Sequence, residues 1–368
     1  MGKRLLAGLF FAVLLLYNGG VAQAESAKSA ILVEMETGRI LYEKNAHQAL
    51  PMASTTKVMT ALVALENAAL SDVVTAGKNA FGVPGTSIYL SEGEQLTLEE
   101  MLYGLMLCSG NDAAVAIAEH VAGTVDSFCQ LMTLKAEQLG CENTVFSTPH
   151  GLPASNHHTT AWDMALITRE ALKNPVFRQI VSTQRASIPW AGHTENRVLN
   201  NKNSLLSSYD GAIGVKTGYT KAAGRCLVFA AEREGMTVVG CVLNDPNWFR
   251  DAAQIMDTGF EKYQMVTMLQ KGESVGLVPV EMGAQESVSV YAGNILSAPV
   301  EKGTLPDMKI DLPGTLTAPV EKGQRVGTAT LYDEGQALAA IPLYASESVT
   351  EQSFRFHLRR LITCWPAG

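Results

Sequence analysis

The sequence lacks every spacing of cysteine or histidine that commonly holds a metal ion. Its six cysteines form no CxxC pair, and its seven histidines form no HExxH or other paired ligand spacing. A GxSxG elbow, which positions the nucleophile in many serine hydrolases with a histidine base, is also missing. These absences argue against a zinc centre and against a Ser-His-Asp triad built on that elbow.

Positive charge is scarce as well. The 368 residues include 28 lysines and arginines against 36 aspartates and glutamates, which gives a formal net charge of -8. A protein that neutralises the phosphates of a nucleic acid needs a basic patch or stripe. The composition therefore excludes nucleic acid as the main partner. A hydrophobic content of 47% indicates a globular chain with a sizeable buried core.

Long apolar runs are missing after the first residues. Lys3 and Arg4 precede an apolar run from Leu5 to Leu16, and Ala22-Gln23-Ala24 follows. This order is typical of a secretory signal peptide, so we expect residues 1–24 to be removed by cleavage after Ala24. The alternative is an uncleaved membrane anchor, but about a dozen apolar residues are few for a span that needs about 20.

An export signal predicts the compartment in which the rest of the chain works. We expect it to fold outside the cytoplasm, at the cell wall or on the outer face of the cytoplasmic membrane. An exported hydrolase meets cell-wall polymer there, whereas nucleotides and cytosolic metabolites stay inside.

The six cysteines leave two interpretations open. An exported chain can form disulfides, and Cys226 with Cys241, or Cys129 with Cys141, are the pairs to consider. A chain of this length does not need disulfides for its stability. We therefore favour buried free thiols that pack as small apolar side chains.

Hydrophobic periodicity divides residues 25–263 into strands, a helical block and more strands. Residues 29–44 alternate as a hairpin around Glu36-Thr37-Gly38, and helical spacing begins near Ser54. Further helices are expected over 98–107, 113–121, 125–139, 161–172 and 251–263, and strands over 213–216, 225–231 and 236–243. This order predicts an α/β fold of the α+β type, with helices packed on a mainly antiparallel sheet.

Helical periodicity fades after Tyr263, and we expect a small all-β domain over residues 275–350. Within it, Ala298-Pro299-Val300-Glu301-Lys302-Gly303 recurs as Ala318-Pro319-Val320-Glu321-Lys322-Gly323. The repeat reflects either two equivalent hairpin edges or a coincidence of turn chemistry. Residues 351–368 mix aromatic and aliphatic side chains with three arginines. Such a tail either contacts an anionic membrane surface or forms a docked terminal strand or helix.

Three short motifs occur in order: Ser54-Thr55-Thr56-Lys57, Ser109-Gly110-Asn111 and Lys216-Thr217-Gly218. Each alone is common, because the first also fits a capped helix start, and the others fit an ordinary loop and an ordinary strand end. If Ser54 lies in the first turn of its helix, Lys57 lies on the same side, within reach of the hydroxyl. The first motif then supplies a nucleophile and its base.

A lysine takes a proton from serine only when the lysine is neutral. Its ordinary pKa of about 10.4 has to fall to about 7, which requires burial and a nearby cation. Lys216 is the candidate cation. The other two motifs complete such a site, with Ser109 relaying a proton to the leaving amine and the Asn111 amide holding a substrate carbonyl.

The strand that ends at the third motif offers the opposite wall of the site. Gly218 lets a peptide backbone approach closely. Thr217 and Lys216 can hold a terminal carboxylate. The three motifs together therefore predict acyl transfer on a peptide with a free carboxyl end.

The same three motifs match the Ser-x-x-Lys, Ser-x-Asn and Lys-Thr-Gly signature of penicillin-binding proteins and serine β-lactamases. More narrowly, the chain from Ser29 to Tyr263 resembles the low-molecular-weight D-Ala-D-Ala carboxypeptidases of the peptidase S11 family. The stretches that support this resemblance are Thr37-Gly38-Arg39-Ile40-Leu41, Pro51 to Thr60, His150-Gly151-Leu152, Thr159-Thr160-Ala161 and Gly214 to Thr220.

The resemblance implies a penicillin-binding or serine β-lactamase-like domain followed by a non-catalytic β domain. It implies that the backbone N–H groups of Ser54 and Tyr219 form the oxyanion hole and that Arg250 helps to hold the substrate carboxylate. Some relatives carry histidine where Tyr219 stands, so the implied role there is one of the backbone.

The implied reaction begins when Ser54 attacks the carbonyl of the penultimate D-Ala of a peptidoglycan stem pentapeptide. The terminal D-Ala leaves, and water then hydrolyses the acyl-enzyme. This chemistry requires no metal or organic cofactor, and we expect β-lactam antibiotics to acylate the same serine.

Three alternatives use the same sequence features differently. A β-lactamase is the closest, but the loop over residues 146–163 contains no glutamate to activate water. A D,D-endopeptidase would use the same catalytic residues. A non-catalytic wall-binding protein would keep the fold and use the β domain.

Overall fold

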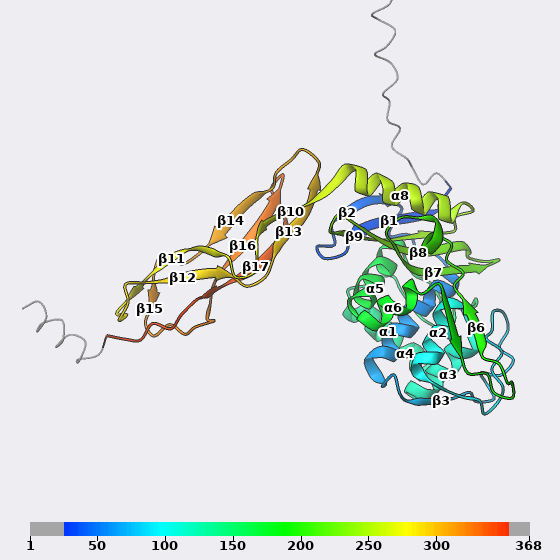
Figure 1. The fold of residues 1–368 in the computed structure, drawn as a ribbon. Coiled ribbons are helices and arrows are strands. Elements are labelled where there is room, and N and C mark those ends of the chain that lie inside the picture. Colours follow the sequence, from blue (N-terminus) through cyan, green and yellow to red (C-terminus); the bar gives the residue numbers. More distant parts are fainter. Residues whose placement is uncertain (1–25, 353–368) are drawn as a thin grey trace, which may run out of the picture.

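The computed structural model describes residues 26–352, which form two parts joined at the end of α8 (Trp248–Lys262), as Figure 1 shows. The larger part is built on a five-stranded antiparallel sheet in the order β2-β1-β9-β8-β7. Its strands are β1 (Ser29–Glu34), β2 (Ile40–Lys44), β7 (Ala212–Thr220), β8 (Gly224–Arg233) and β9 (Met236–Leu243). Two hairpins that are far apart in the sequence thus meet in one sheet.

Both faces of this sheet are covered by helices. Along β8, Cys226 and Val228 pack with the helical block, whereas Leu227 and Phe229 pack on the side of α8. Because both sides are buried, β8 and β9 are apolar at almost every position instead of alternating. The helical elements between β2 and β7 are η1 (Ala53–Thr56), α1 (Lys57–Asn67), α2 (Leu98–Leu107), α3 (Asn111–Ala122), α4 (Val125–Gln138), α5 (Ala161–Lys173), α6 (Pro175–Ser182) and α7 (Leu205–Ser208).

The predicted fold class, helices on a mainly antiparallel sheet, is confirmed. The expected helix over 98–107 and the expected strand over 236–243 have the predicted bounds. Periodicity missed two small hairpins, in which β3 (Val73–Thr75) pairs with β4 (Gln95–Thr97) and β5 (Arg185–Ile188) pairs with β6 (Arg197–Asn200). Strands of three or four residues are too short for a periodic pattern to identify.

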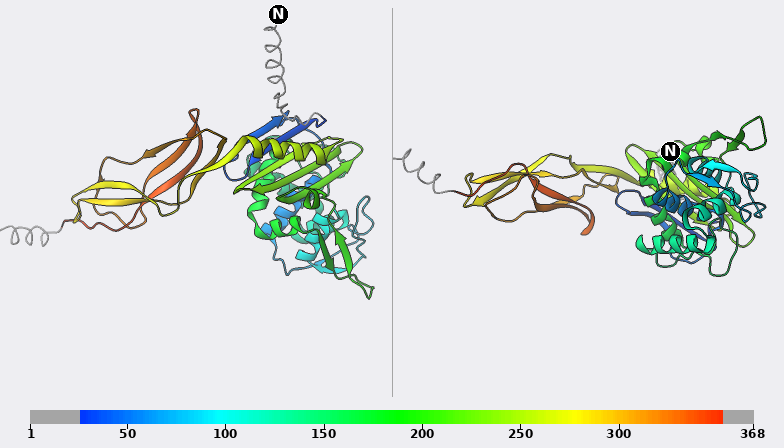
Figure 2. Two further views of the ribbon diagram at one scale, coloured as in Figure 1. Left: turned by 45° about the horizontal axis from the view of Figure 1, so that its top comes forward. Right: turned by 90° about the horizontal axis from the view of Figure 1, so that it is seen from below.

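The smaller part is all β, as predicted, and projects from the end of α8 (Figure 2). It contains a six-stranded sheet in the order β14-β16-β17-β12-β11-β15 and a ribbon of β10 and β13. Its strands are β10 (Tyr263–Leu269), β11 (Ser274–Glu281), β12 (Ser287–Ala292), β13 (Leu296–Glu301), β14 (Asp307–Asp311), β15 (Leu316–Thr317), β16 (Arg325–Asp333) and β17 (Gln336–Ala345). Since β10 pairs with β13, residues 264–274, which the sequence assigned to neither domain, join this part.

The repeated Ala-Pro-Val-Glu-Lys-Gly segments end in similar turns. In each, a backbone N–H three residues on donates to the carbonyl of Glu301 or Glu321, and Gly303 and Gly323 have φ values of 89° and 80°. The residues before the turns differ, because the first copy runs through β13 and the second lies mainly outside the strands. The repeat therefore reflects shared turn chemistry.

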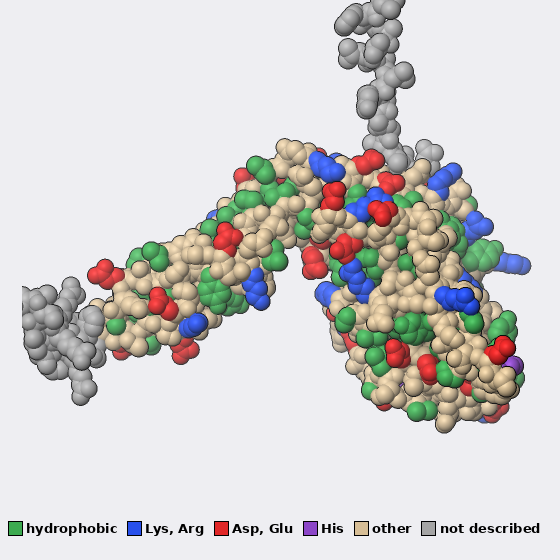
Figure 3. All heavy atoms as spheres, in the orientation of Figure 1, with side chains coloured by type: hydrophobic (Ala, Val, Ile, Leu, Met, Phe, Trp, Pro, Cys, Tyr) green, Lys and Arg blue, Asp and Glu red, His purple; other side chains and the backbone are tan. Residues whose placement is uncertain are grey.

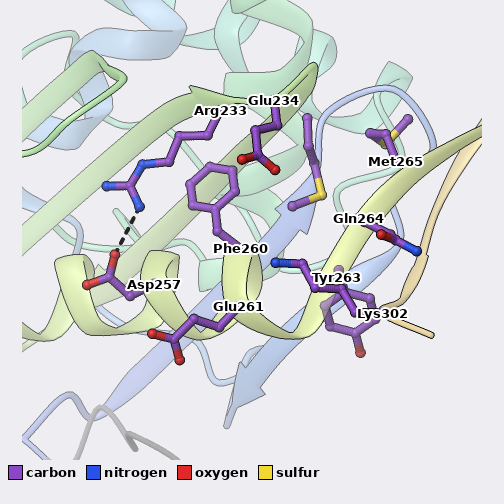
Figure 4. A pocket seen from close by; sticks show the side chains of 10 residues that line it. Arg233, Glu234, Asp257, Phe260, Glu261, Tyr263, Gln264, Met265 and Lys302 are labelled. Carbon is purple, nitrogen blue, oxygen red and sulfur yellow. Dashed lines mark hydrogen bonds and ion pairs between the residues drawn. The ribbon is translucent and has the colours of Figure 1, made fainter.

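The two parts make contact through Arg39, in the turn that leads into β2. Its guanidinium lies 2.5 Å from the carboxylate of Asp333 and donates to the carbonyl of Pro299 at 2.7 Å. A cavity of about 380 Å³ lies between the end of α8, the start of β10 and the β8–β9 turn, where Arg233 points toward Asp257 (Figure 4). No residue of the three motifs lines this cavity, so it is separate from the chemistry they predict.

Neither of the two disulfides considered from the sequence forms. Cys129, Cys141, Cys226 and Cys241 are free and buried in the core under the helical block. Burial raises the pKa of Cys226 to about 12. These thiols pack as small apolar side chains, in agreement with the interpretation favoured by the sequence.

No helix within residues 26–352 combines the length and the apolar character needed to cross a bilayer. On the face in Figure 3, basic and acidic side chains are interspersed over both parts. The predicted signal peptide over residues 1–24 lies outside the described residues, and so does the tail from residue 353 on.

Candidate active site

Ser54 lies in a single 3₁₀ turn, η1, that leads directly into α1 at Lys57. In 3₁₀ geometry the side chains at positions i and i+3 lie directly above each other, whereas in an α-helix they are offset around the helix axis. The Ser54 hydroxyl oxygen and the Lys57 amine nitrogen are 3.1 Å apart. The expected pairing of serine and lysine is therefore present, with a tighter turn than the sequence predicted.

Lys57 is completely buried, and its amine nitrogen makes three contacts. Besides Ser54, it lies 2.7 Å from the side-chain oxygen of Asn111 and 2.8 Å from the carbonyl oxygen of His150. Both oxygens only accept hydrogen bonds, whereas a hydroxyl can also donate. A neutral amine has two N–H donors and one lone pair, so it can bond both oxygens and still accept the Ser54 proton. The geometry suits a general base.

The electrostatic environment favours the neutral form of this lysine. Burial lowers the pKa of Lys57 well below its ordinary value, and the cations Lys216 and Lys202 lower it further, against an opposing effect of Asp112. Lys216 is itself buried, and burial together with Lys202 lowers its pKa to about 7. The two causes named from the sequence, burial and the Lys216 charge, are thus both present, in that order.

Ser109 and Asn111 come from the junction of α2 and α3. Ser109 is buried in the left-handed region with φ 62°, and its carbonyl accepts a bond from the hydroxyl of Thr86 at 2.5 Å. No hydrogen bond within residues 26–352 uses the Ser109 hydroxyl. The amide nitrogen of Asn111 donates to the carbonyl of Pro84 at 2.7 Å while its oxygen accepts from Lys57. In this structure the Asn111 side chain holds the Lys57 amine, and its predicted contact with a substrate carbonyl stays a prediction.

The loop over residues 84–90 is fastened to the second motif, which the sequence did not predict. The buried carboxylate of Asp112 accepts bonds from the backbone N–H groups of Ile88 and Leu90 and from the Ser87 hydroxyl. The Asn111 N–H donates to the Thr86 carbonyl at 2.7 Å. Asp112 follows Asn111 directly in the sequence, but its partners come from a loop more than 20 residues away, so no local pattern identifies them.

The third motif forms the other wall, because β7 is the edge strand of the five-stranded sheet and passes beside η1. A Cβ atom on Gly218 would lie only 2.8 Å from the backbone nitrogen of Ser54 and 3.0 Å from that of Thr55. Only glycine allows this approach. It brings the N–H of Ser54 next to the segment that carries Tyr219, as an oxyanion hole made from these two residues requires. Thr217 is buried and its carbonyl accepts from Lys216 at 3.0 Å.

Within residues 26–352, the side chain of Arg250 contacts Asp251 and none of the motif residues. It lies in the first turn of α8 with its side chain 65% exposed, and its Nε is 3.3 Å from the carboxylate of Asp251. None of its hydrogen bonds or ion pairs in the described part of the chain involves a motif residue. Its role with the substrate carboxylate stays a prediction.

Two further residues belong to the site and were missed. Lys202, just after β6, lowers the pKa of both Lys57 and Lys216, and the His150 carbonyl bonds Lys57. His150 lies in one of the stretches that carried the family resemblance, but a backbone carbonyl leaves no mark in a sequence. Lys202 has no motif of its own, because only tertiary packing brings it to Lys216.

The chain matches two family sequence models. The model of the D-alanyl-D-alanine carboxypeptidases, peptidase S11, matches residues 19–247, and that of the penicillin-binding protein 5 C-terminal domain matches residues 263–351. Among curated relatives, D-alanyl-D-alanine carboxypeptidase DacF of Bacillus subtilis is 33% identical and covers 99% of both chains. DacD of Escherichia coli is 32% identical over 89% of this chain and 88% of its own.

Solved structures agree with both parts of the fold. Penicillin-binding protein 5 from Haemophilus influenzae superposes with a TM-score of 0.76 at 28% identity, over 89% of this chain and 98% of that one. The Streptomyces K15 DD-transpeptidase is 38% identical over 64% of this chain and 97% of its own, with a TM-score of 0.61. Together with the match over residues 19–247, these findings show that the chain belongs to the D-alanyl-D-alanine carboxypeptidases of the peptidase S11 family.

Proposed function

We propose that the Ser54 site removes the terminal D-alanine from peptidoglycan stem pentapeptides through an acyl-enzyme on Ser54. The observation that carries this assignment is the buried amine of Lys57, 3.1 Å from the Ser54 hydroxyl and held on its other sides by two acceptors. Ser54 gives its proton to neutral Lys57 as it attacks the penultimate carbonyl. The terminal D-alanine leaves with a proton, and water then releases the shortened peptide.

Other residues of the site bind the substrate and stabilise the transition state. Lys216, as a cation, and the Thr217 hydroxyl hold the terminal carboxylate of the peptide. The N–H groups of Ser54 and Tyr219 bind the oxyanion, which is typically the largest electrostatic contribution in acyl transfer. The Ser109 hydroxyl relays the proton to the leaving amine, with Asn111 holding Lys57 in place.

Release of D-alanine from a pentapeptide ending in D-Ala-D-Ala tests this proposal. Ser54→Ala is expected to lower the rate by at least about 10³-fold and to abolish labelling by a fluorescent penicillin. Ser207→Ala, an exposed serine whose hydroxyl bonds the carbonyl of Ser204, serves as the matched control and should keep full activity. Equal labelling of Ser54→Ala and wild type would refute the assignment, and so would a wild type that binds the peptide without releasing D-alanine.

A β-lactamase on the same scaffold differs in the fate of the acyl-enzyme. The loop over residues 146–163 carries no glutamate, and its half-buried His150 and buried His157 have pKa values lowered to about 4, mainly by desolvation. We therefore propose that β-lactams acylate Ser54 and stay bound. Endopeptidase activity on a D-Ala cross-link uses the same residues, and cross-linked muropeptides test it alongside the pentapeptide.

We further propose that the chain is exported by a signal peptide cleaved after Ala24. The mature protein then has a catalytic domain over residues 25–263, a β domain that covers 275–350 together with the preceding residues 264–274, and a tail over 351–368 that contacts the membrane surface. The positive and apolar residues of both terminal segments support this. Intact-mass measurement of the exported protein tests the cleavage, and vesicle co-sedimentation with and without residues 351–368 tests the tail.

A further inference from the structure

Two buried carboxylates converge on Ser26, the first described residue of the chain. The Ser26 hydroxyl oxygen lies 2.6 Å from a carboxylate oxygen of Asp251 and also contacts a carboxylate oxygen of Asp245, and its single hydrogen can be donated to only one of them, while the Ser26 backbone N–H lies 3.3 Å from Asp251. Asp245 is 0% exposed and Asp251 is 1% exposed. Both residues lie on the side of the sheet covered by α8, and the mechanism proposed above uses neither.

The negative charge of this pair is poorly compensated. Arg250 is the one lysine or arginine within residues 26–352 that forms an ion pair with either carboxylate, and its guanidinium is 65% exposed. One oxygen of Asp245, Oδ2, has no hydrogen-bond partner among the described residues although it is buried. Burial raises the pKa of Asp245, with Asp251 adding to the effect. A buried carboxylate oxygen without a partner costs free energy that a cation would offset.

We propose that Asp245 and Asp251 form the binding site for the α-ammonium group of Glu25, which is created when the signal peptide is cleaved after Ala24. The inference rests on the cleavage position proposed above. Consecutive Cα atoms are about 3.8 Å apart, so the nitrogen of Glu25 is one residue from an N–H that already bonds Asp251. An ammonium group supplies a full charge and three donors, whereas the amide of the uncleaved chain supplies one donor and no charge.

The position of the pair connects the mature N-terminus to the wall of the active site. The backbone N–H of Asp245 donates to the carbonyl of Arg225 at 2.8 Å, and Arg225 is the register partner of Tyr219 on β7. The docked ammonium therefore stabilises the end of β8 beside the Lys216-Thr217-Gly218 strand. Signal-peptide removal then completes the folded structure in addition to releasing the protein.

The test compares the chain of residues 25–368 with a free α-amino group and the same chain acetylated at Glu25. An α-amino group has an ordinary pKa of about 7.7 to 8.0, so it is charged at pH 7. We expect acetylation to lower the thermal unfolding midpoint by at least about 2 °C at pH 7. Asp245→Asn should abolish the difference. Asp257→Asn, on the same helix as Asp251 but bonded to Arg233 and Tyr209, should preserve it.

Three results would overturn the proposal: no effect of acetylation in the wild type, an equal effect in Asp245→Asn, or full restoration of the acetylated chain by sodium or calcium ions. The last would make the pair a site for a solvent cation. If the exported protein begins at a residue other than Glu25, the cleavage proposal fails on its own, while the acetylation comparison still reports on the carboxylates.

Discussion

The amine nitrogen of Lys57 lies closer to the side-chain oxygen of Asn111, at 2.7 Å, than to the hydroxyl of Ser54, at 3.1 Å. Among the described residues, the second motif therefore contacts Ser54 only through the Lys57 amine. Because the Asn111 side chain is uncharged, its oxygen bonds the Lys57 amine without favouring the protonated form of the lysine.

Asn111→Asp is expected to inactivate the enzyme with little change in shape. The new carboxylate would lie beside the Lys57 amine and raise its pKa, because an opposite charge within about 4 to 6 Å favours the charged form by 1 to 3 pKa units. Acylation by a β-lactam at pH 7 should fall by about 10- to 1000-fold and recover partly at higher pH. Asn67→Asp, at the end of the helix that begins with Lys57, is the control and should acylate at the wild-type rate.

The pH profile of acylation should respond to the two neighbouring lysines in different ways. Removing a cation raises the pKa of Lys57, so Lys216→Gln should move the acid limb to higher pH and eliminate an alkaline limb that reports Lys216, whose pKa is about 7. Lys202→Gln should move both limbs to higher pH, since Lys202 lowers both pKa values.

Rates of penicillin acylation measured from pH 5 to pH 9 check this, with the surface variant Lys173→Gln as control. A shift of either limb toward lower pH in Lys202→Gln would contradict the electrostatic account.

Gly218→Ala should damage the site by steric contact. The added methyl group would lie 2.8 Å from the Ser54 nitrogen and 3.0 Å from that of Thr55, and neither backbone atom can move freely. Loss of one oxyanion-hole donor typically costs about 10² to 10³ in rate. Gly314→Ala, where no atom lies within 4 Å of the new methyl group, should leave both activity and stability unchanged. If Gly218→Ala is acylated at the wild-type rate, the backbones of η1 and β7 are farther apart than the structure shows.

Arg39→Gln should loosen the junction between the two domains without affecting the chemistry. The variant loses the ion pair to Asp333 and the bond to the Pro299 carbonyl, in a contact where both charged side chains are under 20% exposed. We expect a broader distribution of interdomain orientations in small-angle X-ray scattering and penicillin acylation within about twofold of wild type.

A double-mutant cycle with Asp333→Asn should give a coupling of about 0.5 to 2 kcal/mol. Additive single effects on stability would mean that the ion pair does not hold the domains together.

Much of the fold was predictable because it depends on local periodicity. The helix over residues 98–107 and the strand over 236–243 are long and strongly patterned, and their bounds agree with the structure. The short hairpins β3–β4 and β5–β6 were missed, since each pairs segments of three or four residues across a long loop. Their stability comes from contacts that no sequence window contains.

The sequence by itself determined the order of the three motifs, the pairing of Ser54 with Lys57 three residues later, and the class of reaction. Only the tertiary structure decided what surrounds that pair: the Asn111 oxygen, the His150 carbonyl and the charge of Lys202. These groups come from three separate segments of the chain, none of which includes Ser54 or Lys57. Their effect on the pKa of Lys57 depends on burial and distance, which arise when the helices pack on the sheet, whereas a motif requires only neighbours along the backbone.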